Sequence, residues 1–347
     1  MQPMRGVFTA LVTPTRGRGE IDWEGTRSLL SFQAKARVDG VVLGGTTGES
    51  PTLSHGELER LVRLALEELP SRVRVVMGVG KNSLEETCGL ARFAREAGVQ
   101  DAMVVEPYYN APSSPEVRRE FLGPLASQFP DLQFLVYSIP ARTGTRMHPI
   151  DLALLHEEHA NVSALKDACG DDTYSRGVRS LLPRPFSLLS GDDARTLSMM
   201  RNPASAADGV VSVASNLAPF SVRAFVDAAL DGAWERAERA AQALEPLFQN
   251  VTIRVQEPTP RGEVPVVSRN PVPVKAALAV LGLPGGLCRA PLGRLTPLGL
   301  ERLVGSLREA RGRDPEIFSP IERHFGVSVA ERLASPGPWR GVAYERY

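Results

Sequence analysis

The fold is decided first by Gly6-Val7-Phe8-Thr9-Ala10-Leu11-Val12-Thr13-Pro14, GVFTALVTP, near the start of the chain. Its apolar and β-branched residues predict a buried strand, and the strand ends in Val12-Thr13-Pro14. An open doubly wound sheet more often carries a glycine-rich phosphate-binding turn after its first strand. Because no such turn follows here, the segment favours a closed barrel over an open sheet.

Seven similar apolar runs follow along the chain. They begin near Gly40, Val73, Ala102, Gln133, Val162, Phe186 and Gly209. The stretches between them have helical periodicity, and Ser54 with Glu57 and Ser83 with Glu86 predict capping boxes at two helix starts. Strands that alternate with helices predict right-handed parallel βαβ units. Eight such units, at intervals of about 25–35 residues, predict an α/β fold of the (β/α)₈ TIM-barrel type.

The alternation of strands and helices ends near residue 232. We therefore predict three parts: a barrel carrying the active site over residues 1–232, a C-terminal helical domain over 233–310, and an irregular tail over 311–347. A segment punctuated by prolines, 257–273, is expected to interrupt the helical domain as an insert.

Composition excludes several classes of function. The 347 residues contain 40 basic and 40 acidic side chains, so the net charge favours neither nucleic acid nor an anionic membrane as a partner. The three cysteines are far apart, which argues against a disulfide framework and for a reducing compartment. No secretory signal pattern and no membrane-spanning apolar run is visible. We expect a soluble cytoplasmic protein.

Lys166 ends the apolar run Val162-Ser163-Ala164-Leu165. A lysine carried toward the inside of a core loses its preference for the ammonium form, because burial lowers the pKa of an amine. Such an amine is a nucleophile that can form a Schiff base with a carbonyl substrate. The alternative from this segment alone is a strand-end lysine whose charged head extends to water.

In a barrel of this type, chemistry takes place at the C-terminal ends of the strands. The segments expected there contain one amine, two or three phenols, threonine hydroxyls and one arginine, and they are Gly44–Ser50 (GGTTGES), Glu106–Asn110, Tyr137–Gly144, Lys166, Ser190–Asp193 and Gly209–Ser212. They contain no histidine, no set of metal ligands and no phosphate cradle. His156 and His159 have no evident third ligand, so a solvated helix face is expected there and not a zinc site.

The site formed by these segments at the mouth of the barrel is expected to need no metal and no cofactor. A lysine beside a tyrosine indicates carbonyl chemistry through an imine, because the phenol can shuttle protons during carbinolamine dehydration and carbon–carbon bond formation.

These same residues carry a resemblance to a known family. The segments Gly45–Ser50, Pro107–Asn110, Tyr137 with Pro140–Gly144, Lys166, Leu189–Ala194, Gly209–Val213 and Pro271–Lys275 are similar in order and spacing to the dihydrodipicolinate synthase / N-acetylneuraminate lyase family. The resemblance covers roughly residues 5–305. It implies a (β/α)₈ barrel with a C-terminal helical domain, usually assembled as a homotetramer, and a pyruvate-dependent class I aldolase, lyase or synthase.

The resemblance also implies roles for individual residues. Lys166 resembles the lysine that captures pyruvate as an imine, and Tyr137 the phenol that relays protons at that imine. Thr46 and Tyr109 would complete the proton relay. In the family the second tyrosine comes from the neighbouring subunit, so activity would require at least a dimer.

Substrate-binding positions follow in the same way. Thr46, Thr47 and their backbone N–H groups would hold the pyruvate carboxylate, next to Gly45. Arg142 resembles the arginine that grips the carboxylate of aspartate semialdehyde, a role that suits its planar fork. Gly191 and Val211 stand at further substrate-binding positions.

Three functions remain open at this stage. Arg142 and the pair Thr46-Thr47 resemble the corresponding residues of a synthase that condenses pyruvate with L-aspartate 4-semialdehyde in lysine and diaminopimelate biosynthesis. Ser138 and Asp167 replace more usual residues. The segments that contain them, Tyr137–Pro140 and Lys166-Asp167, together with Cys288–Leu292, resemble those of 4-hydroxy-2-oxoglutarate aldolase, whose substrate is a hydroxy-oxo acid. A non-catalytic ligand-binding barrel is the third, disfavoured because Lys166, Tyr137, Thr46 and Tyr109 are all present.

A regulatory cleft is a weaker inference from the resemblance. The positions that correspond to the family's lysine-binding allosteric site are Ser50, His55, Asn82, Glu86 and Tyr108. Leu58 stands where lysine-sensitive enzymes often carry a histidine. We therefore predict weak or absent inhibition by lysine.

Overall fold

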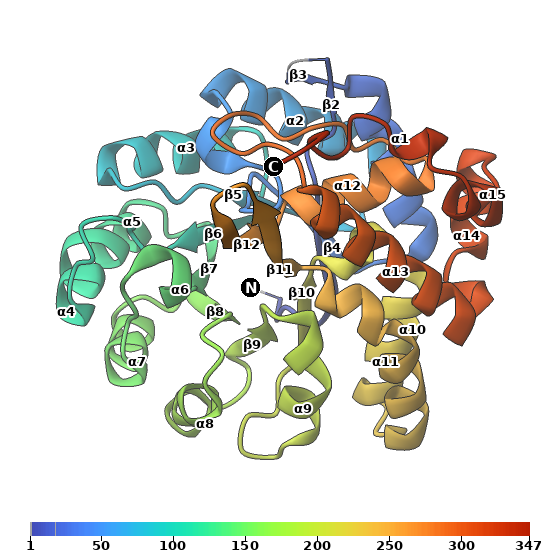
Figure 1. Cartoon of the computed structure of the whole chain (residues 1–347). Helices are drawn as coiled ribbons and strands as arrows, with labels where there is room; N and C mark the ends of the chain where they lie inside the picture. Colours follow the sequence, from blue (N-terminus) through green and yellow to red (C-terminus); the bar gives the residue numbers. More distant parts are fainter. Residues whose placement is uncertain (1, 18) are drawn as a thin grey trace.

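A computed structural model describes residues 2–17 and 19–347. Its centre is a closed barrel of eight parallel strands, as the sequence predicts (Figure 1). The first strand of the chain closes the barrel, because it pairs with both the second and the eighth barrel strand. The barrel strands are β1 (Gly6–Ala10), β4 (Gly40–Leu43), β5 (Arg74–Gly78), β6 (Asp101–Val105), β7 (Gln133–Ser138), β8 (Val162–Asp167), β9 (Ser187–Ser190) and β10 (Gly209–Ser212).

Helices surround the barrel in the predicted alternation. They are α1 (Trp23–Ala36), α2 (His55–Glu68), α3 (Leu84–Glu96), α4 (Ser114–Glu116), α5 (Gly123–Gln128), α6 (Pro140–Thr143), α7 (Pro149–Glu158), α8 (Asp172–Leu181), α9 (Thr196–Arg201) and α10 (Pro219–Leu230). The capping box predicted at Ser54 and Glu57 is formed in full. At the start of α3 the Ser83 hydroxyl accepts the N–H of Glu86, which is half of the predicted box. A minor hairpin, β2 (Thr15–Arg16) and β3 (Glu20–Ile21), follows β1.

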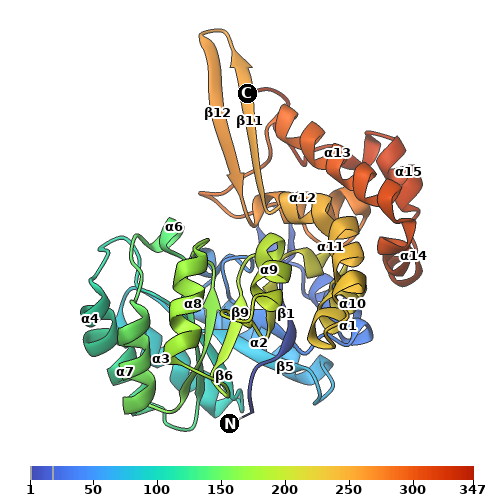
Figure 2. The same cartoon turned by 90° about the horizontal axis from the view of Figure 1, so that it is seen from below.

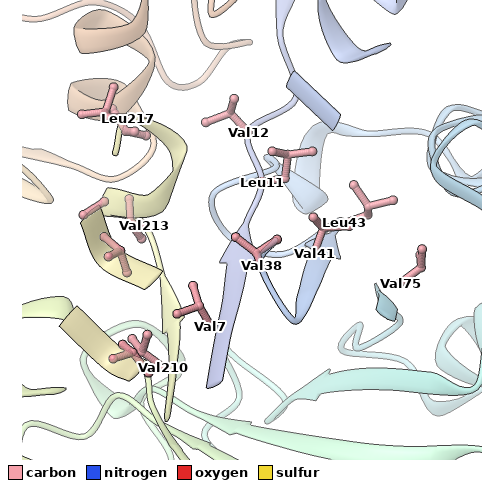
Figure 3. Close-up of a cluster of buried hydrophobic side chains, with 14 of the residues drawn as sticks. Val7, Leu11, Val12, Val38, Val41, Leu43, Val75, Val210, Val213 and Leu217 are labelled. Atoms are coloured by element: carbon pink, nitrogen blue, oxygen red, sulfur yellow. The ribbon is translucent and has the colours of Figure 1, made fainter. Parts of the chain in front are cut away.

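The apolar core has two layers because strand side chains alternate between two faces. One layer fills the barrel interior and includes Phe8, Val42 and Leu135. The other lies between the strands and the helices, where Val7, Val41 and the other labelled side chains of Figure 3 meet. Both faces of the barrel strands are therefore covered, as parallel sheets require.

The chain beyond the barrel is not purely helical. Gly232 lies in the turn between α10 and α11 (Trp234–Gln249), and α12 (Val272–Leu281) and α13 (Pro297–Arg313) follow later. Between α11 and α12 the chain forms an antiparallel hairpin, β11 (Thr252–Thr259) and β12 (Gly262–Arg269). The expectation of a helical domain interrupted by an insert at 257–273 is therefore corrected: the hairpin starts five residues earlier. It projects from the barrel on the side opposite to the N-terminus (Figure 2).

The tail over 311–347 is also more regular than expected. It contains α14 (Ser319–Phe325) and α15 (Val329–Ala334), which cover the C-terminal helices (Figure 2). Ile321, Val329 and Leu333 are buried, so these short helices are stabilised by packing and not by their own length. The prediction of an irregular tail is wrong for this reason.

The structure adds findings on membranes, cysteines and metals. None of the helices within residues 2–17 and 19–347 is long and apolar enough to cross a membrane. Cys88, Cys169 and Cys288 are free thiols. Over the same residues no group of three or more His, Cys, Asp or Glu side chains is arranged to hold a metal ion. His156, expected on a solvated face, is instead half-buried and bonded through Nδ1 to the Val162 carbonyl at 2.8 Å.

Candidate active site

Lys166 and Tyr137 lie side by side at the mouth of the barrel. They are register partners in the neighbouring strands β8 and β7, and the Tyr137 side chain belongs to the interior layer of the core. The Lys166 Nζ lies 3.9 Å from the centroid of the Tyr137 ring. Because Lys166 is only 4% exposed, its head does not extend to water, and the alternative of a solvent-reaching lysine is excluded.

A cavity of about 390 Å³ is lined by this pair and by four other predicted site residues. Thr46 and Thr47 come from the turn after β4, Arg142 from α6 and Gly191 from the end of β9. A Cβ at Gly191 would lie 2.8 Å from the Cβ of Ala168, so a glycine is needed for β9 to end this close to the lysine strand. The cavity therefore joins an amine, a phenol, two hydroxyls and a guanidinium.

The threonine turn is held in place by a buried ion pair. Glu49, at the end of this turn, has a left-handed backbone (φ 61°). Its carboxylate lies 2.6 Å from the ammonium of Lys275 in α12, and the pair is almost fully buried. The Lys275 ammonium also donates to the carbonyls of Thr13 and Leu287, and Glu49 accepts the N–H of Arg289 at 2.8 Å. The C-terminal helices thus fix the turn that carries Thr46 and Thr47.

Asn270, at the base of the hairpin, connects two predicted substrate-binding residues. Its side-chain amide donates to the Thr47 hydroxyl at 2.9 Å, and its backbone carbonyl accepts from the Arg142 guanidinium at 2.9 Å. The Asn270 Oδ1 is buried and has no hydrogen-bond partner within the described chain. This oxygen can therefore accept a hydrogen bond from a donor group of a ligand.

A second cavity, of about 210 Å³, adjoins the first. Thr46, Tyr137 and Arg142 line both cavities, while Gly45, Ser50 and Tyr108 line only the second. Burial lowers the pKa of Arg142, the phenol of Tyr137 raises it, and the charge of Arg269 lowers it further. Arg142 thus lies at the junction of the two cavities and close to a second guanidinium.

The comparisons with known proteins agree with this geometry. The model of the Dihydrodipicolinate synthetase family matches residues 3–309. The chain belongs to this family. It is 39% identical over 327 residues to the 4-hydroxy-tetrahydrodipicolinate synthase of Thermomicrobium roseum, covering 94% of this chain and 100% of the relative. The corresponding synthase of Methanocaldococcus jannaschii is 34% identical over 83% of this chain and 92% of the relative.

Solved structures of dihydrodipicolinate synthases share the fold. The structure of the 4-hydroxy-tetrahydrodipicolinate synthase of Methylacidiphilum fumariolicum has a TM-score of 0.82 and 36% identity, over 93% of this chain and 99% of that one. The synthase of Thermotoga maritima has a TM-score of 0.81 and 32% identity, over 90% and 100% of the two chains.

Two of the predicted catalytic and substrate-binding residues of this dihydrodipicolinate synthetase family member lie outside the two cavities. Tyr109, expected to act with Lys166, is 92% exposed on the loop after β6 and has a positive φ of 74°. Val211 is buried in the barrel interior and lines neither cavity. Within one chain, Tyr109 therefore does not reach the amine.

The proposed allosteric positions are only partly brought together. Ser50 and Tyr108 line the second cavity, and the Asn82 amide oxygen accepts the N–H of Tyr108 at 2.7 Å. Glu86 acts on Tyr108 electrostatically, since burial and the Glu86 charge both raise the pKa of the phenol. His55 is exposed at the start of α2, and no contact places it with the others in the described chain.

Several site residues were not predicted from the sequence. Asn270, Arg254 and Arg269 line the cavity from the hairpin base, more than eighty residues after Lys166. Lys275 ends the motif Pro271–Lys275, and its pairing with Glu49 has no local signal in the sequence. A lysine within an otherwise apolar helical segment does indicate a buried ion pair, because a buried lysine needs a partner.

Proposed function

We propose that the chain is a 4-hydroxy-tetrahydrodipicolinate synthase, which joins pyruvate to L-aspartate 4-semialdehyde through an imine on Lys166. The observation that carries the proposal is the buried Lys166 amine beside the Tyr137 ring, in a cavity that also holds Thr46, Thr47 and Arg142. Relatives of this chain are named 4-hydroxy-tetrahydrodipicolinate synthase, and an amine nucleophile beside carboxylate-binding groups suits the proposed condensation.

The amine attacks the ketone carbon of pyruvate, and loss of water from the carbinolamine forms the imine. In the proposal Tyr137 delivers the proton that the departing hydroxyl needs, and the contact between its ring and the amine supports this role. Loss of a methyl proton then gives an enamine, whose carbon attacks the aldehyde. The amino group of the second substrate can replace Lys166 at the former ketone carbon, which closes the ring and frees the lysine. No external cofactor is needed for this sequence.

The carboxylates of the two substrates have separate partners in the proposal. The hydroxyls and backbone of Thr46 and Thr47 would hold pyruvate, with Asn270 orienting the Thr47 hydroxyl. The Arg142 guanidinium keeps donors free beyond its bond to the Asn270 carbonyl, and these suit the carboxylate of the semialdehyde.

The residues that suggested an aldolase for hydroxy-oxo acids lie outside the cavity. Ser138 donates to Glu106 at 2.9 Å, and Asp167 accepts from the Ser175 hydroxyl at 2.6 Å. Both side chains alternate with those of Tyr137 and Lys166 and point toward the surrounding helices. The side chains of Ser138 and Asp167 therefore do not line the substrate pocket, and the synthase is favoured over the aldolase for hydroxy-oxo acids.

We further propose that the active enzyme is a homotetramer built from dimers. The support is the exposed Tyr109, because its phenol cannot act on Lys166 of its own chain but is available to a second copy. One related structure is described as a monomeric dihydrodipicolinate synthase variant, so the assembly needs its own test. A cytoplasmic location stays a prediction from the sequence.

Borohydride trapping tests the imine. Incubation with pyruvate and borohydride should leave a reduced adduct on the peptide that contains Lys166, detected by mass spectrometry. Lys275 is an internal control, because it is equally buried but paired with Glu49. Absence of an adduct at Lys166 would contradict every enzymatic proposal made here.

A coupled assay with aspartate semialdehyde tests the second substrate. Condensation should be faster with the semialdehyde than retro-aldol cleavage of 4-hydroxy-2-oxoglutarate, and Arg142→Ala should raise the KM for the semialdehyde about tenfold or more. Preferred cleavage of the hydroxy-oxo acid would establish the aldolase instead. Unchanged kinetics of Arg142→Ala would show that its assigned role is wrong.

A further inference from the structure

The base of the β11–β12 hairpin brings two unassigned arginines to the rim of the cavity that contains Lys166. Arg254 lies in β11 and Arg269 ends β12, and both line this cavity. Neither guanidinium takes part in any hydrogen bond or ion pair found within residues 2–17 and 19–347. Both side chains are exposed, unlike the half-buried Arg179 and Arg289, which have carboxylate partners. The two hairpin arginines are therefore available to a ligand.

The strand register places both arginines on one face of the hairpin. Thr252 lies opposite Arg269 and Arg254 lies opposite Val267, so the two arginines are diagonal neighbours. Diagonal neighbours in an antiparallel pair are separated by about 7–8 Å, within reach of long side chains. Two like charges at this distance repel each other unless an anion lies between them.

Arg142 adds a third positive charge at the same place. The charge of Arg269 contributes to the lowered pKa of the Arg142 guanidinium, after the larger effect of burial. Two carboxylates share the cavity lining, but both have partners. Asp193 is buried and accepts the N–H groups of Val213 and Ala214, and Asp192 accepts the N–H of Ala194. The rim thus keeps an excess of positive charge.

The other face of the hairpin explains why the arginines hold this position. Ile253 and Glu257 are buried on that face, and Glu257 accepts the N–H of Leu298 at the start of α13 at 2.9 Å. The hairpin is therefore anchored on the C-terminal helices by one face, and at its base the two arginines on the opposite face line the cavity.

We propose that Arg254 and Arg269 form, with Arg142, a carboxylate-binding rim that selects an acceptor aldehyde carrying a carboxylate. The inference rests on the proposed function, since it assigns residues to the second substrate of that reaction. The pyruvate carboxylate binds deeper, at Thr46 and Thr47, so it is held by different groups. The rim also attracts the anionic acceptor from solution, because a cationic cleft raises the rate of encounter with anions.

Steady-state kinetics provide the first test, with the double variant Arg254→Gln/Arg269→Gln. The KM for aspartate semialdehyde should rise about five- to twentyfold, while the amount of pyruvate adduct trapped on Lys166 stays as in the wild type. In the wild type, sodium chloride should raise this KM more steeply than in the variant. Arg261→Gln is the control for charge on the hairpin: it removes one positive charge, where the double variant removes two, from the turn beyond the ends of both strands.

A binding experiment separates this inference from the proposed reaction. Calorimetry with linear dicarboxylates of increasing length, and with monocarboxylates of equal length, should show a preference of the wild type for one dicarboxylate. The double variant should lose that preference and Arg261→Gln should keep it. If aspartate semialdehyde is not condensed but the preference depends on Arg254 and Arg269, the rim stands and the proposed reaction fails. An equal preference in the double variant, or an unchanged KM for the semialdehyde, would overturn the rim.

Discussion

At the scale of single residues, Glu106 is the most strongly perturbed carboxyl near the active site. It follows β6, is fully buried and accepts from the Ser138 hydroxyl and the Met147 N–H. Burial raises its pKa from 4.5 to about 7, against the opposing effect of these two hydrogen bonds. Ser138 is the direct neighbour of Tyr137, so this carboxyl lies immediately behind the strand that carries Tyr137.

The raised pKa makes stability depend on pH. Between pH 4.5 and about 7 the unfolded chain has released the Glu106 proton while the folded chain still holds it. The stabilising contribution is therefore complete at low pH and is lost as the pH rises through 7. Glu106→Gln keeps similar hydrogen bonds without the titration. We expect the wild type to lose up to about 3 kcal/mol relative to this variant between about pH 5 and pH 8.

Denaturant unfolding of both proteins across this pH range measures the difference. Parallel pH profiles for the wild type and Glu106→Gln would show that this carboxyl titrates as in the unfolded chain. Glu86→Gln, a change at a carboxyl outside this cluster, serves as the control and should not flatten the profile.

At the scale of elements, the contact between α12 and the threonine turn links the C-terminal region to the site. The Glu49–Lys275 pair is buried on both sides, and removal of one partner leaves the other charge without compensation. We expect Lys275→Met to cost about 3–5 kcal/mol in the free energy of unfolding and to raise the KM for pyruvate, because Glu49 ends the turn that carries Thr46 and Thr47.

Chemical denaturation and pyruvate kinetics check this prediction. The double variant Glu49→Gln/Lys275→Met should recover much of the lost stability, since it leaves no unpaired charge. If Lys275→Met alone is as stable as the wild type, the pair does not hold the turn.

The hairpin shows why some elements were missed from the sequence. Pro258 and Pro265 lie within β11 and β12, and a proline in an apolar run argues against a central strand. A sheet of only two strands has two free edges, where a missing N–H costs little. The prolines therefore argue against a strand inside a sheet, but they do not exclude a hairpin with two free edges such as this one.

At the scale of the whole molecule, the exposed Tyr109 predicts shared active sites. Tyr109→Phe and Lys166→Ala should each be nearly inactive alone, because one lacks the relayed proton and the other the nucleophile. Mixed assemblies of the two variants contain some sites with a wild-type lysine and a wild-type tyrosine from different chains. We expect activity to reappear when the variants are mixed under conditions that exchange subunits.

Sedimentation of the mixture should confirm that assemblies form. Persistent inactivity of properly assembled mixtures would contradict a tyrosine donated between chains. Full activity of Tyr109→Phe alone would show that this phenol has no part in the relay.

The whole molecule also decides the response to lysine. Lys81 lies in the region of the proposed allosteric cleft and donates to the Ser50 carbonyl at 3.1 Å. Its ammonium would repel the side chain of a lysine bound there, and Leu58, which is buried in the core, has no group for a hydrogen bond. We therefore keep the prediction of weak or absent inhibition, measured as activity against lysine concentration. Potent inhibition at low micromolar lysine would contradict it.

The sequence by itself determined the barrel and the central pair of the site. Eight short apolar runs alternate with segments of helical periodicity. Each of these patterns depends only on residues that are close in the sequence, so it can be recognised without knowledge of the tertiary structure. Because barrel chemistry lies at the C-terminal strand ends, Lys166, Tyr137, Thr46 and Arg142 could be placed at one mouth without coordinates.

Only the tertiary structure decided what surrounds that pair. Asn270, Arg254 and Arg269 reach the cavity because a hairpin far along the chain is anchored on α13, and no local pattern encodes that contact. The tail helices exist only through burial against the C-terminal helices. Contacts between distant segments depend on how whole surfaces pack together, and for that physical reason the rim facing the second substrate was visible only in the folded chain.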